Sequence, residues 1–86
     1  MTVHIPGALL SYTAQQGDVP VDGATLADAL TALDRRYPGI RFRIITEQDR
    51  IRPHIRIFVD EEQLQDLAAP LRRTDTVYIV CALSGG

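Results

Sequence analysis

The residues with the clearest chemical potential are the last two, Gly85 and Gly86, which follow an apolar stretch ending at Leu83 with only Ser84 between. Glycine has no side chain and a permissive backbone, so such a tail could enter a narrow channel and present a bare carboxylate. Another enzyme could adenylate that carboxylate, since no Cβ would crowd a nucleotide phosphate, and would supply positioning and charge stabilisation. A frayed end or a truncated chain would also explain the two glycines.

Three other side chains, His4, His54 and Cys81, could act as a base, a ligand or a nucleophile. The histidines are far apart in sequence, and each is predicted to lie at the surface or edge of a strand. Cys81 is predicted to be a buried, inert thiol, because apolar surroundings raise the pKa of a thiol. The reactive alternatives stay open for all three. Gly-rich phosphate loops, paired cysteines and Ser-centred elbows are missing, so no catalytic residue and no metal site of its own is predicted.

Composition predicts one small globular domain, residues 1–86, with a flexible tail at 84–86. Apolar residues make up 45% of the chain and charged residues 23%, which is ordinary for a soluble protein. The chain begins with Met without a basic-then-apolar leader, and no apolar run approaches the roughly 20 residues that a membrane span needs. The single cysteine indicates a reducing compartment, and a cytoplasmic location is expected.

Charge argues against nucleic acid as a partner, because the net charge is −2 and no long basic run is present. All nine basic residues are arginine. A genome biased toward arginine codons would explain this bias. The functional alternative is that the protein carries no side-chain amine that could be acylated.

Strands are predicted at both ends of the chain and in its middle. Residues 3–12 look like an irregular first strand, which forms a hairpin with a short second strand at 19–21. Alternating apolar residues favour strands at 40–45 and 54–59, and the apolar segment 76–83 favours a last strand.

One helix is predicted between these strands. Thr25 can cap it, with Asp28 three residues on as a weak capping box, and Pro38 and Gly39 end it. Residues 60–75 are interpreted as turns with one short helical turn. The helical spacing gives one apolar stripe, formed by Leu26, Ala29, Leu30, Leu33 and Tyr37.

A single amphipathic helix needs a partner surface, so the sequence predicts an α+β domain with the helix packed on one face of a mixed sheet. The last strand is predicted to lie in mid-sheet, parallel to the first, because it is apolar on both sides. If the helix covers the face that holds Ile57 and Ile79, alternate residues point to the open face. These residues are Arg56, Phe58, Tyr78 and Val80. They are predicted to form a partner-binding patch, although ordinary surface apolarity or burial under loops remain alternatives.

The chain also resembles the β-grasp, ubiquitin-like family, and most of all its prokaryotic sulfur-carrier branch. Members of this branch are the small subunit of molybdopterin synthase, the thiamine-thiazole sulfur carrier and the carrier serving cysteine synthesis. The helix and its exit resemble the family in "ATLADALTALDRRYPGI", a strand and turn in "IRIFVDEEQL", and the closing segment in "PLRRTDTVYIVCALSGG". A weaker match, "IPGALLSYT", is closest to the cysteine-synthesis type.

This resemblance implies a mixed four- to five-stranded β-grasp sheet and a cycle of reactions at the tail. An E1-like adenylating enzyme would activate the Gly86 carboxylate with ATP and magnesium, and a sulfur source would convert it into a thiocarboxylate. A sulfur-accepting biosynthetic enzyme would then receive the sulfur, for molybdopterin, thiamine, cysteine or a related metabolite. Gly85 would be the spacer, with Ser84 and Leu83 as the neck. The protein would bind no cofactor itself and would be at most the non-catalytic small subunit of a synthase.

Two features depart from the family pattern or qualify it. Residues 60–62, Asp-Glu-Glu, replace the common Asn-Gly-type turn, and the chain has no lysine. The lack of lysine fits a carrier more readily than a chain-forming modifier. Two alternatives remain: a ubiquitin-like modifier joined to other proteins through Gly86, and a β-grasp interaction domain whose Gly-Gly end is incidental.

Overall fold

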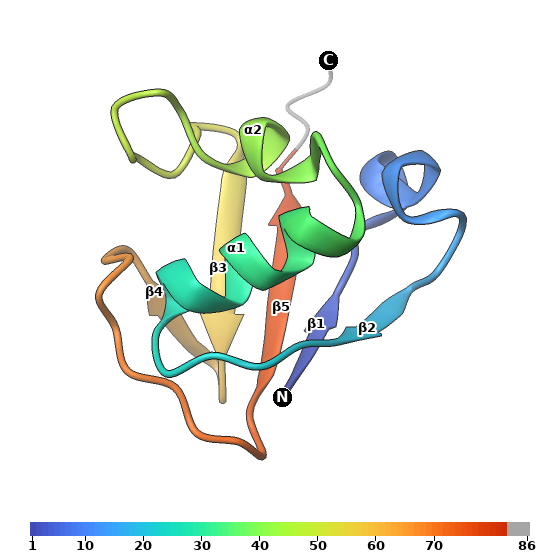
Figure 1. Cartoon of the computed structure of the whole chain (residues 1–86). Helices are drawn as coiled ribbons and strands as arrows, with labels where there is room; N and C mark the ends of the chain where they lie inside the picture. The colour runs from blue at the N-terminus through green and yellow to red at the C-terminus, as the bar shows by residue number, and fades with distance from the viewer. Residues whose placement is uncertain (83–86) are drawn as a thin grey trace.

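A computed structural model describes residues 1–82, so Leu83 and the predicted tail at 84–86 lie outside the described residues. The described part forms one five-stranded mixed sheet in the order β2-β1-β5-β3-β4. Strand β5 is central, parallel to β1 and antiparallel to β3 (Figure 1), which confirms the position predicted for the last strand. The strands are β1 (Thr2–His4), β2 (Asp18–Pro20), β3 (Ile55–Val59), β4 (Glu62–Leu64) and β5 (Thr76–Cys81).

Helix α1 (Leu26–Arg36) crosses one face of this sheet, as predicted (Figure 1). Its N-terminus is capped by Thr25, whose Oγ1 accepts a hydrogen bond from the Asp28 backbone N–H at 3.2 Å. The Asp28 carboxylate accepts in turn from the Ala24 backbone N–H at 3.2 Å. The first bond satisfies a backbone donor of the first turn, and the second ties the residue before the cap to the helix, so the arrangement is a shifted form of the capping box.

The core lies between α1 and the sheet. The α1 stripe and the inward residues of β3 and β5 are fully or almost fully buried, which confirms the predicted packing. Tyr37 is only partly buried and packs at the margin of this core. The most completely buried of these residues are Leu26, Ala29, Leu30, Leu33, Ile57, Val77 and Ile79.

The strand predicted at 40–45 is wrong, because residues Ile40–Ile44 form a short helix, α2. Its two buried residues, Ile40 and Ile44, are four positions apart and therefore lie on one helical face. The Asp34 carboxylate fixes the start of α2 by accepting from the backbone N–H groups of Gly39 at 3.1 Å and Arg41 at 3.0 Å. Gly39, at φ 103°, supplies the left-handed turn between the two helices.

The long first strand is also wrong beyond His4, since residues Gly7–Thr13 form a 3-10 helix, η1. Pro6 precedes η1 in an extended conformation, and Leu9 and Thr13 are its buried residues. The expected hairpin between the first two strands is present, with η1 inside its connection.

Residues 60–75 contain a strand where turns and a helical turn were predicted. Strand β4 pairs with β3 through a two-residue connection, Asp60 and Glu61, with Val59 opposite Glu62. Both connecting residues have positive φ, 51° and 69°, as a type I′ hairpin turn requires. The turn geometry is thus that of an Asn-Gly hairpin, although neither residue is the usual one.

No helix in residues 1–82 has the length and apolar character to cross a membrane.

Candidate docking face and tail exit

The four predicted patch residues lie together on the face of the sheet opposite α1. Arg56 pairs with Val80 across β3 and β5, and Phe58 pairs with Tyr78. Directly opposite side chains in a sheet lie close enough to contact each other, so the four make one block. Tyr78 is 46% exposed and Val80 43%, whereas Phe58 and Arg56 are half-buried. We call this block the open face.

The open face continues onto the neighbouring strands through residues that the sequence did not single out for it. His4 is level with Tyr78 on one side and with Asp18 on the other. Its Nδ1 lies 2.8 Å from Asp18 Oδ1, and its ring centroid lies 5.5 Å from that of Tyr78. His4 is thus the exposed strand histidine that was expected. His4 follows the buried Val3 directly in β1, so its side chain must point to the opposite, open face, and the alternation in the sequence could have predicted this.

The tail leaves the sheet at a well-defined place. Strand β5 ends at Cys81, and the Ala82 backbone N–H donates to the His54 carbonyl at 2.7 Å. This bond holds the last described residue against the start of β3. The Gly86 carboxylate predicted to react, and its neck and spacer residues, lie beyond this point and outside the described residues.

A small hollow lies beside the end of β5. It is lined by apolar η1 residues together with Tyr12, Arg43, His54 and Cys81. Burial raises the pKa of the Cys81 thiol, so the uncharged form is favoured there. This pKa direction agrees with the predicted inert thiol, although Cys81 is partly rather than fully buried.

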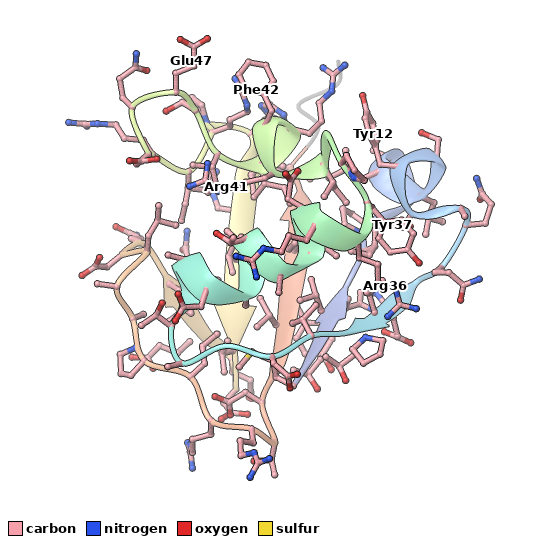
Figure 2. The ribbon with its side chains drawn as sticks, in the orientation of Figure 1. Tyr12, Arg36, Tyr37, Arg41, Phe42 and Glu47 are labelled. Atoms are coloured by element: carbon pink, nitrogen blue, oxygen red, sulfur yellow. The ribbon has the colours of Figure 1, made fainter. Side chains whose placement is uncertain are left out.

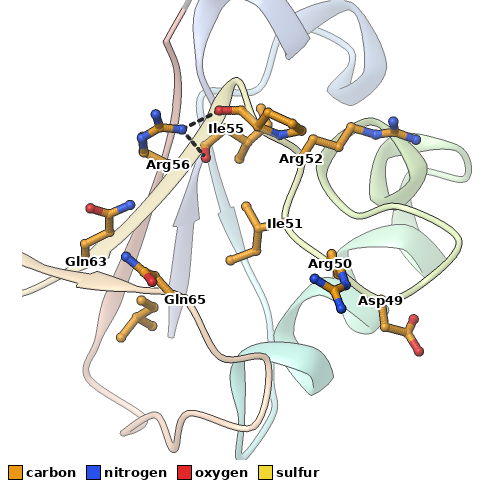
Figure 3. A pocket seen from close by; sticks show the side chains of 10 residues that line it. Asp49, Arg50, Ile51, Arg52, Ile55, Arg56, Gln63 and Gln65 are labelled. Atoms are coloured by element: carbon orange, nitrogen blue, oxygen red, sulfur yellow. Dashed lines mark hydrogen bonds between the residues drawn. The ribbon is translucent and has the colours of Figure 1, made fainter.

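A second, open cleft lies between the loop before β3 and the strand β4 (Figure 3). Arg50, Arg52 and Arg56 line it together with glutamine side chains from the β4 segment. The Arg56 guanidinium donates to the carbonyls of Pro53 and Ile55, which holds it at the rim (Figure 3). The cleft is open and polar, so it suits contact with another surface better than exclusion of water from a reaction.

The chemistry of residues 1–82 is otherwise plain. Within that range no three His, Cys, Asp or Glu side chains come together as a metal site would need. Every buried side-chain nitrogen or oxygen of the described part also has a hydrogen-bond partner. Unsatisfied buried polar groups call for an explanation in functional terms, and none is needed here.

Comparison with known proteins finds relatives that match almost the whole length of the chain. Residues 3–86 match the model of the ThiS family. The sulfur carrier protein CysO of Mycobacterium tuberculosis (strain ATCC 25618 / H37Rv) is 30% identical over 91 residues, covering 100% of this chain and 98% of CysO.

Two solved structures extend the comparison. One chain of the Amycolatopsis orientalis BexX/CysO complex superposes with a TM-score of 0.91 and 30% identity, covering 99% of this chain and 98% of that one. SAMP1 from Haloferax volcanii gives a TM-score of 0.79 and 26% identity, covering 100% of this chain and 98% of that one. The predicted β-grasp fold is therefore confirmed.

Proposed function

Since the chain belongs to the ThiS family, we propose that it is a cytoplasmic sulfur carrier protein that is a co-substrate of other enzymes. The Gly86 carboxylate attacks the α-phosphorus of ATP in a magnesium-dependent, E1-like enzyme, which releases pyrophosphate and leaves an acyl-adenylate. Sulfide then attacks the acyl carbon, displaces AMP and loses its proton. The product is a C-terminal thiocarboxylate, which a biosynthetic enzyme uses as its source of sulfur.

The observation that carries this proposal is the extent of the family match, which runs through the fold and includes Gly85 and Gly86. The geometry supports it, because β5 is paired on both sides and Ala82 is bonded to His54. A rigid body with a short tail at a fixed exit suits transfer of one end group between enzymes. The likeness to a chain of the BexX/CysO complex supports the presence of a protein partner.

Among the acceptor pathways considered, cysteine synthesis is favoured over molybdopterin and thiamine. Two observations support it: the 30% identity to CysO over the whole chain, and the resemblance of the "IPGALLSYT" segment to the cysteine-synthesis type. The recipient would be the enzyme that forms a carbon–sulfur bond from the thiocarboxylate. Incubating the loaded carrier with each candidate acceptor and measuring which one consumes the sulfur tests this choice.

The central test is the intact mass of the protein after incubation with the adenylating enzyme, ATP, magnesium and sulfide. Replacing one carboxylate oxygen by sulfur adds about 16 Da, which one oxidation of Met1 or Cys81 would mimic. The gain should therefore vanish on deletion of Gly86 and persist in Cys81→Ser. A thiol-reactive alkylator should capture it on the C-terminal fragment. No gain in the wild-type chain with an active adenylating enzyme would contradict the proposal, as would an alkylated C-terminal fragment from the chain that lacks Gly86.

A second candidate is a protein modifier. The likeness to SAMP1, the small archaeal modifier protein 1 of Haloferax volcanii, favours it. Both functions begin with the acyl-adenylate, so the acceptor distinguishes them. A modifier would yield higher-mass conjugates joined from Gly86 to lysines of other proteins, whereas a carrier yields the thiocarboxylate alone. An interaction domain with an incidental Gly-Gly end would show neither product and would keep its function without Gly86.

A further inference from the structure

The arginines are distributed unevenly in this acidic chain. Residues 41–56 contain five of the nine arginines but only two of the eleven acidic residues. The rest of the chain contains four arginines and nine acidic residues. The net charge of −2 therefore conceals a basic segment, which folds as α2, the loop after it and the start of β3. A local concentration of one sign of charge creates a field that a neutral average hides.

Three arginines of this basic segment lie near the end of β5. Arg43 lines the hollow beside Cys81, and Arg56 is paired with Val80 on the other face of β5. Arg52 lies between them in sequence and lines the open cleft at the same end (Figure 3). We call Arg43, Arg52 and Arg56 the basic collar.

The collar side chains are held in place by the protein itself. The guanidinium carbon of Arg52 lies 4.6 Å from the centre of the Phe42 ring, and its Nε donates to the Phe42 carbonyl at 2.7 Å. The guanidinium carbon of Arg43 lies 5.3 Å from the centre of the Tyr12 ring. Tyr12 and Phe42 both lie at the tail end of the molecule (Figure 2). Arginines fixed in this way lose less conformational entropy when they bind a partner.

The collar is also not neutralised from within. Among the residues that the structure describes, the ion pairs engage Arg41 and Arg72 but no collar arginine. Asp49, an acidic residue of the basic segment, is paired with Arg41 at 3.3 Å. The positive charge at the tail exit therefore remains available to a partner.

We propose that the basic collar binds an acidic rim around the channel of the enzyme that takes the tail. The inference rests on the proposed reaction at Gly86. Four residues follow Ala82, and an extended chain spans at most about 3.6 Å per residue, so Gly86 reaches about 14 Å. Any enzyme acting on the carboxylate must therefore bring its channel entrance close to the collar. Charge complementarity at that contact speeds docking and selects the partner.

Reversal of a collar charge tests the proposal with the adenylating enzyme that loads the wild-type chain. Arg43→Glu should raise the KM of the adenylating enzyme for the carrier about tenfold at ~50 mM salt and leave kcat unchanged. A tenfold change lies within the range known for electrostatic steering. The neutral Arg43→Gln should give a smaller rise and is the second variant if Arg43→Glu does not fold. The effect should shrink to about twofold at ~0.5 M salt, where charges more than a few ångströms apart are screened.

Arg73→Glu is the matched control, because it makes the same charge change on an exposed residue of the loop before β5 (Figure 1). That loop leads into the start of β5, at the end of the molecule opposite Cys81. Equal rises in KM for Arg43→Glu and Arg73→Glu would overturn the proposed role of the collar. A rise in KM for Arg43→Glu that salt does not reduce, or a fall in kcat with KM unchanged, would also overturn it. A wild-type chain that no adenylating enzyme loads would instead refute the proposed reaction itself.

Discussion

Tyr78 and Ile79 are consecutive residues of β5 whose side chains point to opposite faces of the sheet. Tyr78 is 46% exposed on the open face, and Ile79 is 1% exposed beneath α1. Truncating each to alanine should therefore separate binding from stability. Tyr78→Ala should weaken docking to the adenylating enzyme and leave the domain folded, whereas Ile79→Ala should destabilise the fold.

The structure sets the expected magnitudes. Removing a fully buried isoleucine costs about 2–5 kcal/mol of unfolding free energy, because it leaves a cavity in a packed core. At 4–8 °C per kcal/mol for a domain of this size, a loss of about 3 kcal/mol lowers Tm by about 12–24 °C. Tyr78→Ala removes the cross-strand contact with Phe58 and the contact with the His4 ring, worth about 0.2–1 kcal/mol each, so it should cost less than Ile79→Ala. If Tyr78 anchors the interface, its truncation costs about 2 kcal/mol of binding, or about 30-fold in Kd.

Thermal unfolding followed by circular dichroism measures the first quantity, and isothermal titration calorimetry with the adenylating enzyme measures the second. Thr31→Ala is the control, because it truncates an exposed side chain of α1, on the side of the sheet away from the open face. A fall in Tm for Tyr78→Ala as large as that for Ile79→Ala would show that Tyr78 is core. An unchanged Kd with Tm preserved would show that the open face does not dock this enzyme.

Two further predictions concern packing and the thiol. Gly23→Ala should lower the unfolding free energy by about 1–3 kcal/mol in denaturant titration, because a Cβ there would lie 2.8 Å from Asp28 Cβ and 2.9 Å from the Ala29 backbone nitrogen. Gly7→Ala, which meets nothing within 4 Å, should stay within about 0.5 kcal/mol of wild type, and equal losses would contradict this. Burial raises the Cys81 pKa, so native Cys81 should react with iodoacetamide more slowly than the unfolded chain at neutral pH. The rate should rise as pH approaches the raised pKa, and equal rates at neutral pH would refute the shielding.

The main helix and strands could be predicted because the spacing of their apolar residues fits only one type of secondary structure. The stripe of α1 is long enough to define a helical period, and Thr25 marks where the helix begins. The inward and outward residues of β3 and β5 followed from strict alternation, which is why the open face could be predicted with its four residues. The central position of the last strand, parallel to the first, followed from its apolar character.

The errors arose where a short segment fits two periods or none. Ile40 and Ile44 are four positions apart, a spacing that both an alternating strand and a helical turn allow. Strand β4 is an edge strand with exposed Glu62 and Gln63, so it carries no alternation to detect. The contact between His4 and Asp18 depends on the register of two distant strands, which sequence alone does not determine.

Strand β5 joins the three properties that a carrier of this kind requires. Its inward side chains are core, its outward side chains belong to the open face, and its end fixes where the tail begins. A slip of one residue would exchange the two faces, burying Tyr78 and exposing Ile79. Pairing with β1 on one side and β3 on the other opposes that slip. In the proposed function, this one strand would determine both which residues meet the partner and from what point the carboxylate is delivered to it.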